Sequence, residues 1–388
     1  MTTVLLAGQA SQQTGLARVT RAIADHLAGE DDVHVLGIDC FAGRAARRTE
    51  AGWTLHTNPA PYDVFAELEL TALLDEVRPD VVLLYNDLWI VSRYFERLDR
   101  AAHRCPVVGY CPIDGTIDDP DYIRSVAPLD ALVVFTDFAR RTVQPYRDAQ
   151  VIAHGLDVQA FFPVDRDEAR RTLFPGRPDL RDGFWVLNAN RNQPRKRLDL
   201  TLRGFAEFAA GKPPDVRLYL HCGLKDIGID VLQEARSLGI EDRLLFTHRA
   251  DAHPRVATSA LNLIYNACDV GVNTATGEGW GLIGCEHAAT GAAQVVPRHS
   301  ACAELWEGAA ELLSPAVSSG AGLFAGGAIE PSDLAASLER LYADRRLREE
   351  RGRAAYERIT APQYRWEHIA GQWRALFGDV SRARSRVL

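Results

Sequence analysis

The sequence predicts an α/β protein of two domains, each a parallel sheet covered by helices. Short apolar runs typical of buried strands alternate along the whole chain with stretches of helical periodicity. This alternation is the pattern of parallel sheets with helices on their faces. The 388 residues exceed what one ordinary core holds. Near residues 161–163 the composition changes to a charged stretch rich in proline, where we place a domain boundary.

The first domain is predicted to span residues 1–160. Its strands are expected at 3–7, 33–38, 80–85, 106–110, 131–135 and 151–153. A glycine-containing loop that ends at Gly15 separates the first strand from a helix at 16–27. Because open α/β sheets bind ligands at the carboxyl ends of their strands, Gly15 is a candidate binding residue, and a simple turn is the alternative. The basic run at 44–48 is expected to be solvated surface or loop.

The second domain is predicted to span residues 161–362, followed by a terminal helix in 363–388. Strands are expected at 183–189, 216–221, 243–247, 268–273, 294–297 and 310–313, and helices at 198–210, 334–341 and 345–358. The spacing of apolar residues in 198–210 indicates a helix with one buried face. The last helix is expected to begin near Tyr364.

Residues 277–291 read GEGWGLIGCEHAATG and follow an apolar run expected to be a buried strand. The order is strand, glycine loop, helix, with the helix starting near Gly281. Such a junction leaves backbone N–H groups at the helix start, and glycine lets an anion approach them. Glu278 in the loop and Glu286 in the helix then flank the anion. The alternative interpretation makes Glu278 a helix-dipole partner and Glu286 a solvated helix residue.

A second candidate region, at 190–199, reads NRNQPRKRLD and follows the strand at 183–189. Four basic residues in seven concentrate positive charge on a loop that we expect beside the Glu278 loop, on a neighbouring strand. A diphosphate carries two to three negative charges and is bound by such groups. The alternative is a solvated basic loop.

Composition limits the class of partner. Lys+Arg 44 against Asp+Glu 52 gives a formal net charge of −8, which disfavours nucleic acid as a partner. Seven scattered cysteines without a C-x-x-C pair indicate reduced thiols in a cytoplasmic protein. The N-terminus has no signal-peptide pattern, and no run of eighteen apolar residues occurs. Peripheral membrane contact stays open.

The string from Glu278 to Glu286 resembles the Glu-x7-Glu signature of the retaining glycosyltransferases of family 4, the group 1 glycosyl transferases. Two further matches support the resemblance. Arg191 and Lys196 have the five-residue spacing of the family's arginine and lysine, and His154-Gly155-Leu156-Asp157 with Phe162-Pro163 is similar to its hinge segment. Arg197 departs from the pattern, since glycine often stands there.

The resemblance implies the GT-B fold, in which two Rossmann-like domains face each other across a cleft and the C-terminal helix crosses back to the first domain. It also implies a nucleotide-diphosphate-sugar donor, with UDP, GDP or another nucleotide, bound by the second domain. The residues implied to bind the donor are Gly15, Arg191, Lys196, Glu278, Gly279, Trp280, Gly281, Leu282 and Glu286.

Within this set the roles differ. Glu286 is implied to hold the ribose and Glu278 the transferred sugar, while Arg191 and Lys196 stabilise the leaving diphosphate. The reaction is implied to need neither metal nor cofactor, and no Asp-x-Asp occurs in a metal-like setting. The resemblance also implies that the sugar is transferred with retention, by attack on the same face.

The first domain is implied to bind the acceptor, a carbohydrate or another molecule with a hydroxyl group. Where family members usually carry a catalytic-loop histidine, residues 109–116 offer Asp114, which could bind a sugar hydroxyl or accept the acceptor's proton. An ordinary turn is the alternative. Asn86 and Asp87, at the end of a strand, are weaker acceptor candidates. His154 is expected to be structural.

Two other functions fit the same residues. A nucleotide-sugar epimerase also uses Rossmann-like domains and would form product from the donor alone. A non-catalytic nucleotide-sugar-binding protein would bind the donor without hydrolysing it. A dehydrogenase is disfavoured because the first loop lacks G-x-G-x-x-G. The base, the sugar, the acceptor, the linkage and the oligomeric state do not follow from the sequence.

Overall fold

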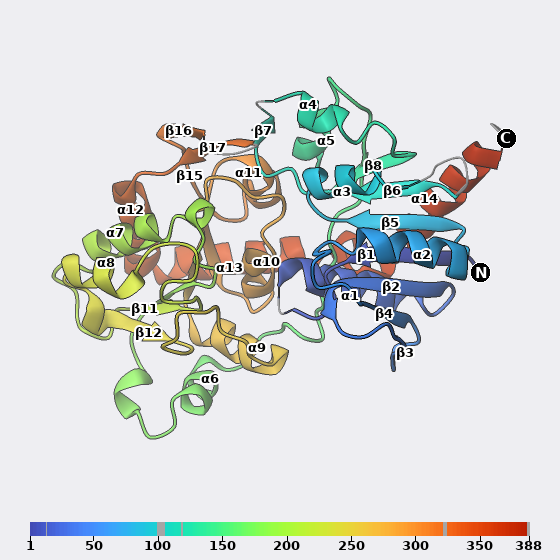
Figure 1. Cartoon of the computed structure of the whole chain (residues 1–388). Coiled ribbons are helices and arrows are strands. Elements are labelled where there is room, and N and C mark those ends of the chain that lie inside the picture. The colour runs from blue at the N-terminus through green and yellow to red at the C-terminus, as the bar shows by residue number, and fades with distance from the viewer. Residues whose placement is uncertain (13, 99–104, 118, 321–323, 386–388) are drawn as a thin grey trace. The chain divides into compact units, whose positions relative to one another are not determined.

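The computed structural model describes residues 1–12, 14–98, 105–117, 119–320 and 324–385. The chain forms two compact units. Unit 1 contains Met1–Ile113, Ile117–Gly155 and the chain from Pro362 onward, and unit 2 contains Asp114–Thr116 and Leu156–Ala361. Figure 1 shows that each unit has a sheet with helices packed around it. The predicted class, α/β with two parallel sheets, is confirmed.

The described part of unit 1 contains an eight-stranded sheet in the order β3-β4-β2-β1-β5-β6-β8-β9. The strands are β1 Thr3–Gly8, β2 Asp32–Phe41, β3 Ala46–Arg48, β4 Thr54–Asn58, β5 Val81–Tyr85, β6 Val107–Tyr110, β8 Ala131–Val134 and β9 Gln150–Val151. From β4 to β9 all neighbours run parallel, so their carboxyl ends share one edge. The helices are α1 Gly15–Leu27, α2 Glu67–Val77, α3 Leu88–Tyr94, α4 Asp121–Arg124 and α5 Asp137–Val143, and β7 is Thr116–Ile117.

Strands β3 and β4, at one edge of this sheet, were not predicted. β3 is fully exposed and pairs antiparallel with β4. The basic run 44–48, expected to be solvated surface or loop, therefore includes a short edge strand. Three exposed residues, Ala46, Arg47 and Arg48, give no alternation of apolar and polar side chains from which a strand could be predicted. Arginines on an edge strand oppose pairing with another chain.

The last helix, α14 Trp366–Ser385, belongs to unit 1. Arg374 Nε donates a hydrogen bond to Asp31 Oδ2 at 3.0 Å, which fastens α14 just beyond the end of α1. Trp366 lies against Gly155, where an added Cβ would come within 2.3 Å of the indole. Only glycine permits that approach. The predicted return of the C-terminal helix to the first part of the chain is confirmed.

Unit 2, as far as the structure describes it, contains a six-stranded sheet in the order β12-β11-β10-β13-β14-β15, with every neighbouring pair parallel. The strands are β10 Trp185–Asn188, β11 Arg217–Leu220, β12 Leu244–Phe246, β13 Val270–Val272, β14 Ala293–Pro297 and β15 Glu311–Leu313, and β16 Val317–Gly320 pairs antiparallel with β17 Phe324–Ala328. The helices are α6 Arg166–Leu173, α7 Leu198–Ala209, α8 Val231–Ser237, α9 Thr258–Ala267, α10 Leu282–Ala288, α11 Ser300–Trp306, α12 Pro331–Ala343 and α13 Arg345–Ile359. The 3-10 turns of unit 2 are η1 Pro178–Leu180, η2 Pro194–Lys196 and η3 Glu241–Arg243, and η4 Pro362–Tyr364 belongs to unit 1.

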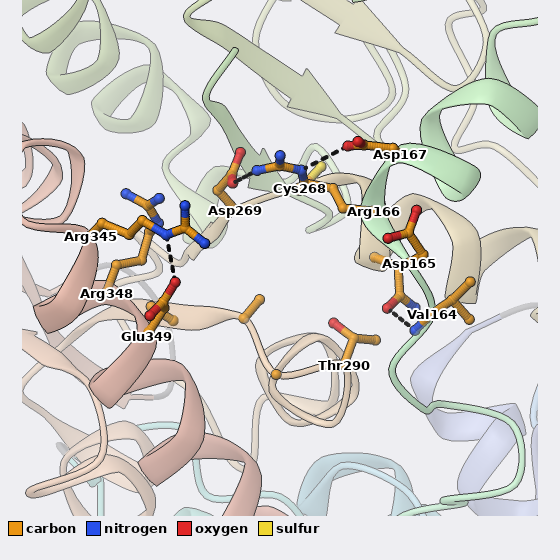
Figure 2. A pocket seen from close by; sticks show the side chains of 14 residues that line it. Val164, Asp165, Arg166, Asp167, Cys268, Asp269, Thr290, Arg345, Arg348 and Glu349 are labelled. Carbon is orange, nitrogen blue, oxygen red and sulfur yellow. Dashed lines mark hydrogen bonds and ion pairs between the residues drawn. The ribbon is translucent and has the colours of Figure 1, made fainter. Parts of the chain in front are cut away.

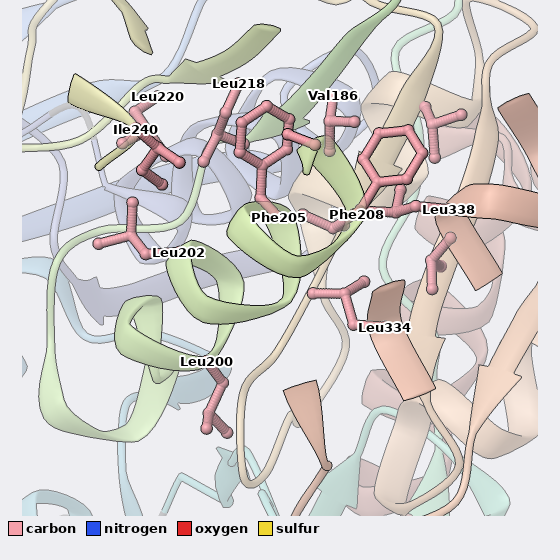
Figure 3. Close-up of a cluster of buried hydrophobic side chains, with 14 of the residues drawn as sticks. Val186, Leu200, Leu202, Phe205, Phe208, Leu218, Leu220, Ile240, Leu334 and Leu338 are labelled. Carbon is pink, nitrogen blue, oxygen red and sulfur yellow. The ribbon is translucent and has the colours of Figure 1, made fainter. Parts of the chain in front are cut away.

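The core of unit 2 lies between its sheet and helices α7 and α12 (Figure 3). Phe205 of α7 and Leu334 of α12 are fully buried, as is Val186 of β10. Burying one such side chain contributes about 1.5–3 kcal/mol. At Gly204 an added Cβ would come within 2.7 Å of Leu334, so α7 and α12 pack closely at this glycine. This packing holds β10, and the loop that follows it, in a fixed position.

Candidate functional site

Two loops lie side by side at the carboxyl edge of the unit 2 sheet. One follows β10 and contains residues 189–197, and the other follows β13 and contains residues 273–281. β10 and β13 are parallel neighbours, so the prediction that these loops adjoin is confirmed. Thr276 N donates to Arg195 O at 2.9 Å, and Thr274 Oγ1 donates to Arg197 O at 2.8 Å. These bonds join the two loops directly.

Lys196 and Glu278 form an ion pair between the two loops. Lys196 Nζ donates to Glu278 Oε1, and the side chains are only 12% and 6% exposed. Asn273 Nδ2 donates to the same oxygen at 3.0 Å. Charged groups withdrawn from water must be paired and hydrogen-bonded, so this contact set holds both side chains in one arrangement. The structure thus brings together two residues that the sequence selected separately.

Arg195, which the sequence analysis did not select, completes this cluster. Its Nη1 donates to Gly277 O and lies 3.4 Å from Glu278 Oε2. Its Nη2 lies 3.5 Å from Asp114 Oδ2. Asp114 groups with unit 2 rather than with the surrounding chain of unit 1. We call Lys196, Arg195, Glu278 and Asp114 the charged cluster; it contains two cations and two carboxylates.

In the charged cluster, burial and neighbouring opposite charges shift the pKa values of the side chains in opposite directions. Burial alone would raise the pKa of the Glu278 carboxyl, but Lys196 and Arg195 outweigh it and lower that pKa from 4.5 to about 2. Burial lowers the pKa of the Lys196 ammonium, although Glu278 opposes this change. At Glu278 the charges outweigh burial because two cations face the carboxylate. At Lys196 burial outweighs the carboxylate, and the like charge of Arg195 lowers the pKa further. Glu278 is therefore ionised at neutral pH and accepts hydrogen bonds.

The segment that enters α11 fixes the main chain of Glu278. Glu278 N donates to Ser300 Oγ at 3.1 Å, and Ala301 N donates to Glu278 O at 3.2 Å. Ser300 has a φ of 45°, a left-handed conformation uncommon outside glycine. His299 Nε2 donates to Ala275 O at 2.9 Å, so Nδ1 accepts from the Ser300 hydroxyl at 3.0 Å. No spacing pattern in the sequence marks His299 or Ser300.

Residues 279–282 form the turn between Glu278 and α10. Gly281 has a φ of 90° and precedes the helix, which begins at Leu282, close to the predicted start. That conformation favours glycine. Trp280 is buried. The connection from Glu278 to α10 is thus made by Gly279, Trp280 and Gly281, with Leu282 as the first helical residue. The donor contacts predicted for these four residues stay predictions.

Glu286 lies on α10 and is buried. Tyr265 of α9 donates its hydroxyl hydrogen to Glu286 Oε2 at 2.8 Å. The alternative in which Glu286 is a solvated helix residue is therefore wrong: the helix turns this carboxylate toward α9, which periodicity alone does not reveal. A buried carboxylate held by a tyrosine is a fixed acceptor for hydroxyl groups.

Arg191 binds Asp226 rather than a member of the charged cluster. Its Nε donates to Asp226 Oδ2 at 2.7 Å and its Nη2 to Oδ1 at 3.1 Å. Asp226 has a φ of 41°, so an unusual backbone conformation presents its carboxylate to the guanidinium. This two-bond pairing is the stronger form of arginine–carboxylate contact. Arg191 remains at the carboxyl edge, on the same loop as Lys196.

The candidates in unit 1 lie at the carboxyl edge of its own sheet. Gly15 is the first residue of α1, where Thr14 Oγ1 accepts from Ala17 N at 3.1 Å. Asn86 and Asp87 follow β5; Asn86 is buried and its Oδ1 accepts from Asp87 N at 3.0 Å. These positions fit ligand binding at a strand end. Their roles stay predictions.

The loop after β1 is held by a carboxylate of β2. Asp39 accepts from the backbone N–H of Ala10 at 2.7 Å and of Gln12 at 2.9 Å. It also accepts from Ser11 N and from Ser11 Oγ, at 3.2 and 3.0 Å. An internal anion thus satisfies the amides of residues 10–12.

His154 lies in an aromatic cluster inside unit 1. Its Nδ1 is 2.7 Å from Tyr110 OH, and its ring packs against Phe135. Burial lowers the pKa of the imidazole to about 3, so it is neutral at physiological pH. These contacts agree with the structural role expected for His154.

A hollow of about 360 Å³ lies at the opposite edge of the unit 2 sheet, beside the residues that precede β13 and β14 (Figure 2). Charged side chains from α6 and α13 surround it. Arg166 Nη1 donates to Asp269 Oδ1 at 2.9 Å, and Arg345 Nε to Glu349 Oε1 at 2.6 Å. These charges compensate one another, and the hollow is at the amino ends of the strands. We therefore take the charged cluster, rather than this hollow, as the candidate site.

Within the described ranges, no group of three or more His, Cys, Asp and Glu side chains is arranged to hold a metal ion. None of the helices in the same ranges combines the length and apolar character needed to cross a bilayer.

Residues 185–375 match the family described as glycosyl transferase-like. The match includes both glutamates of the two-glutamate signature and agrees with the family that the signature predicted. The predicted GT-B fold is confirmed by the solved structures described below.

Two curated relatives are similar over part of their length. D-inositol 3-phosphate glycosyltransferase from Geodermatophilus obscurus is 34% identical over 178 residues, 43% of this chain and 37% of that protein. Mannosylfructose-phosphate synthase from Agrobacterium fabrum is 28% identical over 186 residues, 46% of this chain and 38% of that protein. The similarity therefore spans less than half of the length of either relative.

Solved structures match nearly the whole chain. Sucrose-phosphate synthase from Thermosynechococcus elongatus has a TM-score of 0.76 at 16% identity, covering 99% of this chain and 100% of that one. Anabaena HepE in complex with UDP-glucose has a TM-score of 0.71 at 16% identity, covering 98% and 100%. At this level of identity the likeness establishes the fold alone.

Proposed function

We propose that the chain is a retaining glycosyltransferase that moves a sugar from a nucleotide-diphosphate-sugar donor to a hydroxyl-bearing acceptor. One observation carries the proposal: the buried Lys196–Glu278 pair at the carboxyl edge of the unit 2 sheet. Ligands of open α/β sheets bind at this edge. The names of the relatives, a glycosyltransferase and a sugar-phosphate synthase, support it.

The cations provide the chemistry of the leaving group. When the bond from the anomeric carbon to the diphosphate breaks, negative charge grows on the leaving oxygen, and fixed cations stabilise that charge more than the ground state. Lys196 meets the diphosphate in this proposal. Arg191 joins it when its guanidinium turns from Asp226. These side chains supply the charge that a metal ion supplies in other transferases, so the proposed reaction is metal-independent.

The carboxylates recognise hydroxyl groups. Glu278, which is ionised and fixed, accepts hydrogen bonds from the transferred sugar, and Glu286 accepts them from the ribose. The acceptor attacks the face from which the diphosphate leaves, which retains the configuration. We place Asp114 at the acceptor, where it binds a hydroxyl or takes its proton. Asn86 and Asp87 are the further acceptor contacts that we propose in unit 1.

Two other functions are tested by the same measurements. An epimerase would convert the donor sugar without an acceptor, and a binding protein would leave the donor intact. We propose the cytoplasm as the compartment because the seven cysteines are free thiols. Peripheral membrane contact is a further prediction.

A donor screen tests the proposal. Thermal shifts are measured with UDP-, GDP-, ADP- and TDP-sugars, starting with UDP-glucose, the ligand of the HepE structure. The best binder is then followed for slow hydrolysis and for conversion of its sugar. We expect one nucleotide to raise the melting temperature and to be hydrolysed. A chain that binds none of them contradicts the proposal, and conversion of the sugar without hydrolysis favours the epimerase.

Two variants locate the donor. Lys196→Ala and Glu286→Ala are each expected to weaken donor affinity by about tenfold or more, because each removes a charge-assisted contact. Lys212→Ala is the matched control, since Lys212 pairs with Glu339 away from the charged cluster. Donor affinity unchanged in both test variants would remove both residues from the site.

A further inference from the structure

Arg195 and Lys196 contact different oxygens of the Glu278 carboxylate. Lys196 Nζ and Asn273 Nδ2 both donate to Glu278 Oε1, whereas Arg195 Nη1 lies 3.4 Å from Oε2. Each oxygen of the carboxylate therefore faces its own cation. This division fixes the rotation of the carboxylate plane.

Arg195 also binds the backbone carbonyl that precedes Glu278. The same Nη1 donates to Gly277 O, so one guanidinium contacts both the peptide that enters Glu278 and the side chain of that residue. Its Nη2 lies 3.5 Å from Asp114 Oδ2. A guanidinium is a planar fork that can serve several acceptors at once, which an ammonium on a flexible stem does less well.

We propose that Arg195 is a positioning residue for the transferred sugar: it acts through Glu278, while Lys196 is the cation that meets the diphosphate. This inference rests on the proposed function. It gives the adjacent basic residues Arg195 and Lys196 different roles. Lys196 is mostly buried beside Glu278, whereas the Arg195 side chain is 38% exposed and reaches Glu278 from the outer side.

The test compares a donor with its sugar-free product. Affinities for UDP-glucose and for UDP are measured by calorimetry on the full chain. If another donor binds best in the screen, that donor and its nucleoside diphosphate take the place of UDP-glucose and UDP. In Arg195→Gln we expect the affinity for UDP-glucose to fall by about tenfold, the loss of a contact to a charged group. The affinity for UDP is expected to stay within about twofold of wild type. Arg195→Lys keeps the charge but lacks the planar guanidinium. Its affinity for UDP-glucose is expected to lie between those of wild type and Arg195→Gln.

Arg197→Gln is the matched control, because this neighbouring arginine pairs with Asp199. It is expected to change neither affinity. If Arg195→Gln does not fold, Arg195→Lys carries the comparison through the same ratio of affinities.

Two results overturn the inference alone. A parallel loss of UDP and UDP-glucose affinity makes Arg195 a direct diphosphate contact. A melting temperature that falls with both affinities unchanged makes it only structural. A wild-type chain that binds no nucleotide or nucleotide-sugar of the screen instead overturns the proposed function.

Discussion

The loop after β1 in unit 1 and the loop after β10 in unit 2 follow strands at the carboxyl edges of their sheets, yet their electrostatics differ. The amides of Ala10, Ser11 and Gln12 are bound by the fixed carboxylate of Asp39. In unit 2 the arrangement is reversed: a fixed carboxylate, Glu278, is surrounded by cationic side chains.

The difference shows that a glycine loop at a strand end is not by itself an anion site. In unit 1 the chain supplies its own anion, Asp39, to the amides of residues 10–12. In unit 2 the cations come from a loop joined to its neighbour by one backbone hydrogen bond, from Thr276, and by the hydroxyl of Thr274. We therefore expect substitutions in the charged cluster to affect donor turnover and substitutions around Asp39 to affect stability.

The largest effect on turnover is expected for Lys196→Ala. Removing one preorganised charge-stabilising group costs on the order of 10²–10³ in kcat. Donor hydrolysis by the purified variant measures this, with Lys212→Ala as the lysine control. Equal loss in both variants would show that lysine charge in general, rather than its place in the cluster, governs the rate.

Glu278→Gln is expected to lower donor hydrolysis by about 100-fold, because a neutral amide replaces the ionised acceptor. It also has a pH signature. Since the folded-state pKa of Glu278 is lowered from 4.5 to about 2, its stabilisation is fully present above pH 4.5 and is lost as the pH falls toward 2.

Denaturant unfolding from pH 6 to pH 3 measures that signature. The stability advantage of wild type over Glu278→Gln, which we expect to be about 1–3 kcal/mol, should shrink as the pH falls. Glu339→Gln, which alters an exposed carboxylate, is the control. A constant difference across this range would refute the ionised, paired Glu278.

A smaller effect is expected for Tyr265→Phe. The change removes the hydroxyl that donates to Glu286 Oε2 at 2.8 Å and leaves the ring in place. Donor affinity should fall by about three- to tenfold and stability by about 1 kcal/mol. Calorimetric titration of the donor checks the first value, with Tyr219→Phe as a control whose hydroxyl lies near Thr247. If Tyr219→Phe lowers donor affinity as much as Tyr265→Phe does, the loss does not act through Glu286, and the proposed contact of Glu286 with the donor is contradicted.

The smallest effect on donor affinity is expected for Asp39→Asn. Neutralising the carboxylate that binds the loop amides should lower stability by about 1–3 kcal/mol and leave donor affinity within about twofold. Thermal melts with and without donor measure both. A large change in donor affinity would show that residues 10–12, which Asp39 binds, contact the donor in addition to the contact predicted for Gly15.

The sequence predicts the regular parts of this fold well, because buried parallel strands are continuous apolar runs. It also predicts that Lys196 and Glu278 lie on adjoining loops, since the order of strands follows from repeated α/β units. The exposed edge strand β3 was missed because its three residues carry no apolar signal.

Side-chain direction in the loops could not be predicted. Spacing selected Arg191, which faces Asp226, and passed over Arg195, which faces Glu278. Arg195 lies in a 3-10 turn that ends at Lys196, and Arg197, which follows, has a left-handed φ of 47°. Such backbone choices are set by tertiary contacts that join distant residues, and spacing does not encode them.

A crystal structure of the chain with UDP-glucose, or with the best donor of the screen, would show directly whether the charged cluster binds the donor. We expect a diphosphate in contact with Lys196 Nζ, a sugar hydroxyl bonded to Glu278 and the ribose diol at Glu286. A donor bound elsewhere, or a charged cluster that keeps its ion pairs and touches no ligand while the donor is bound, would contradict this expectation.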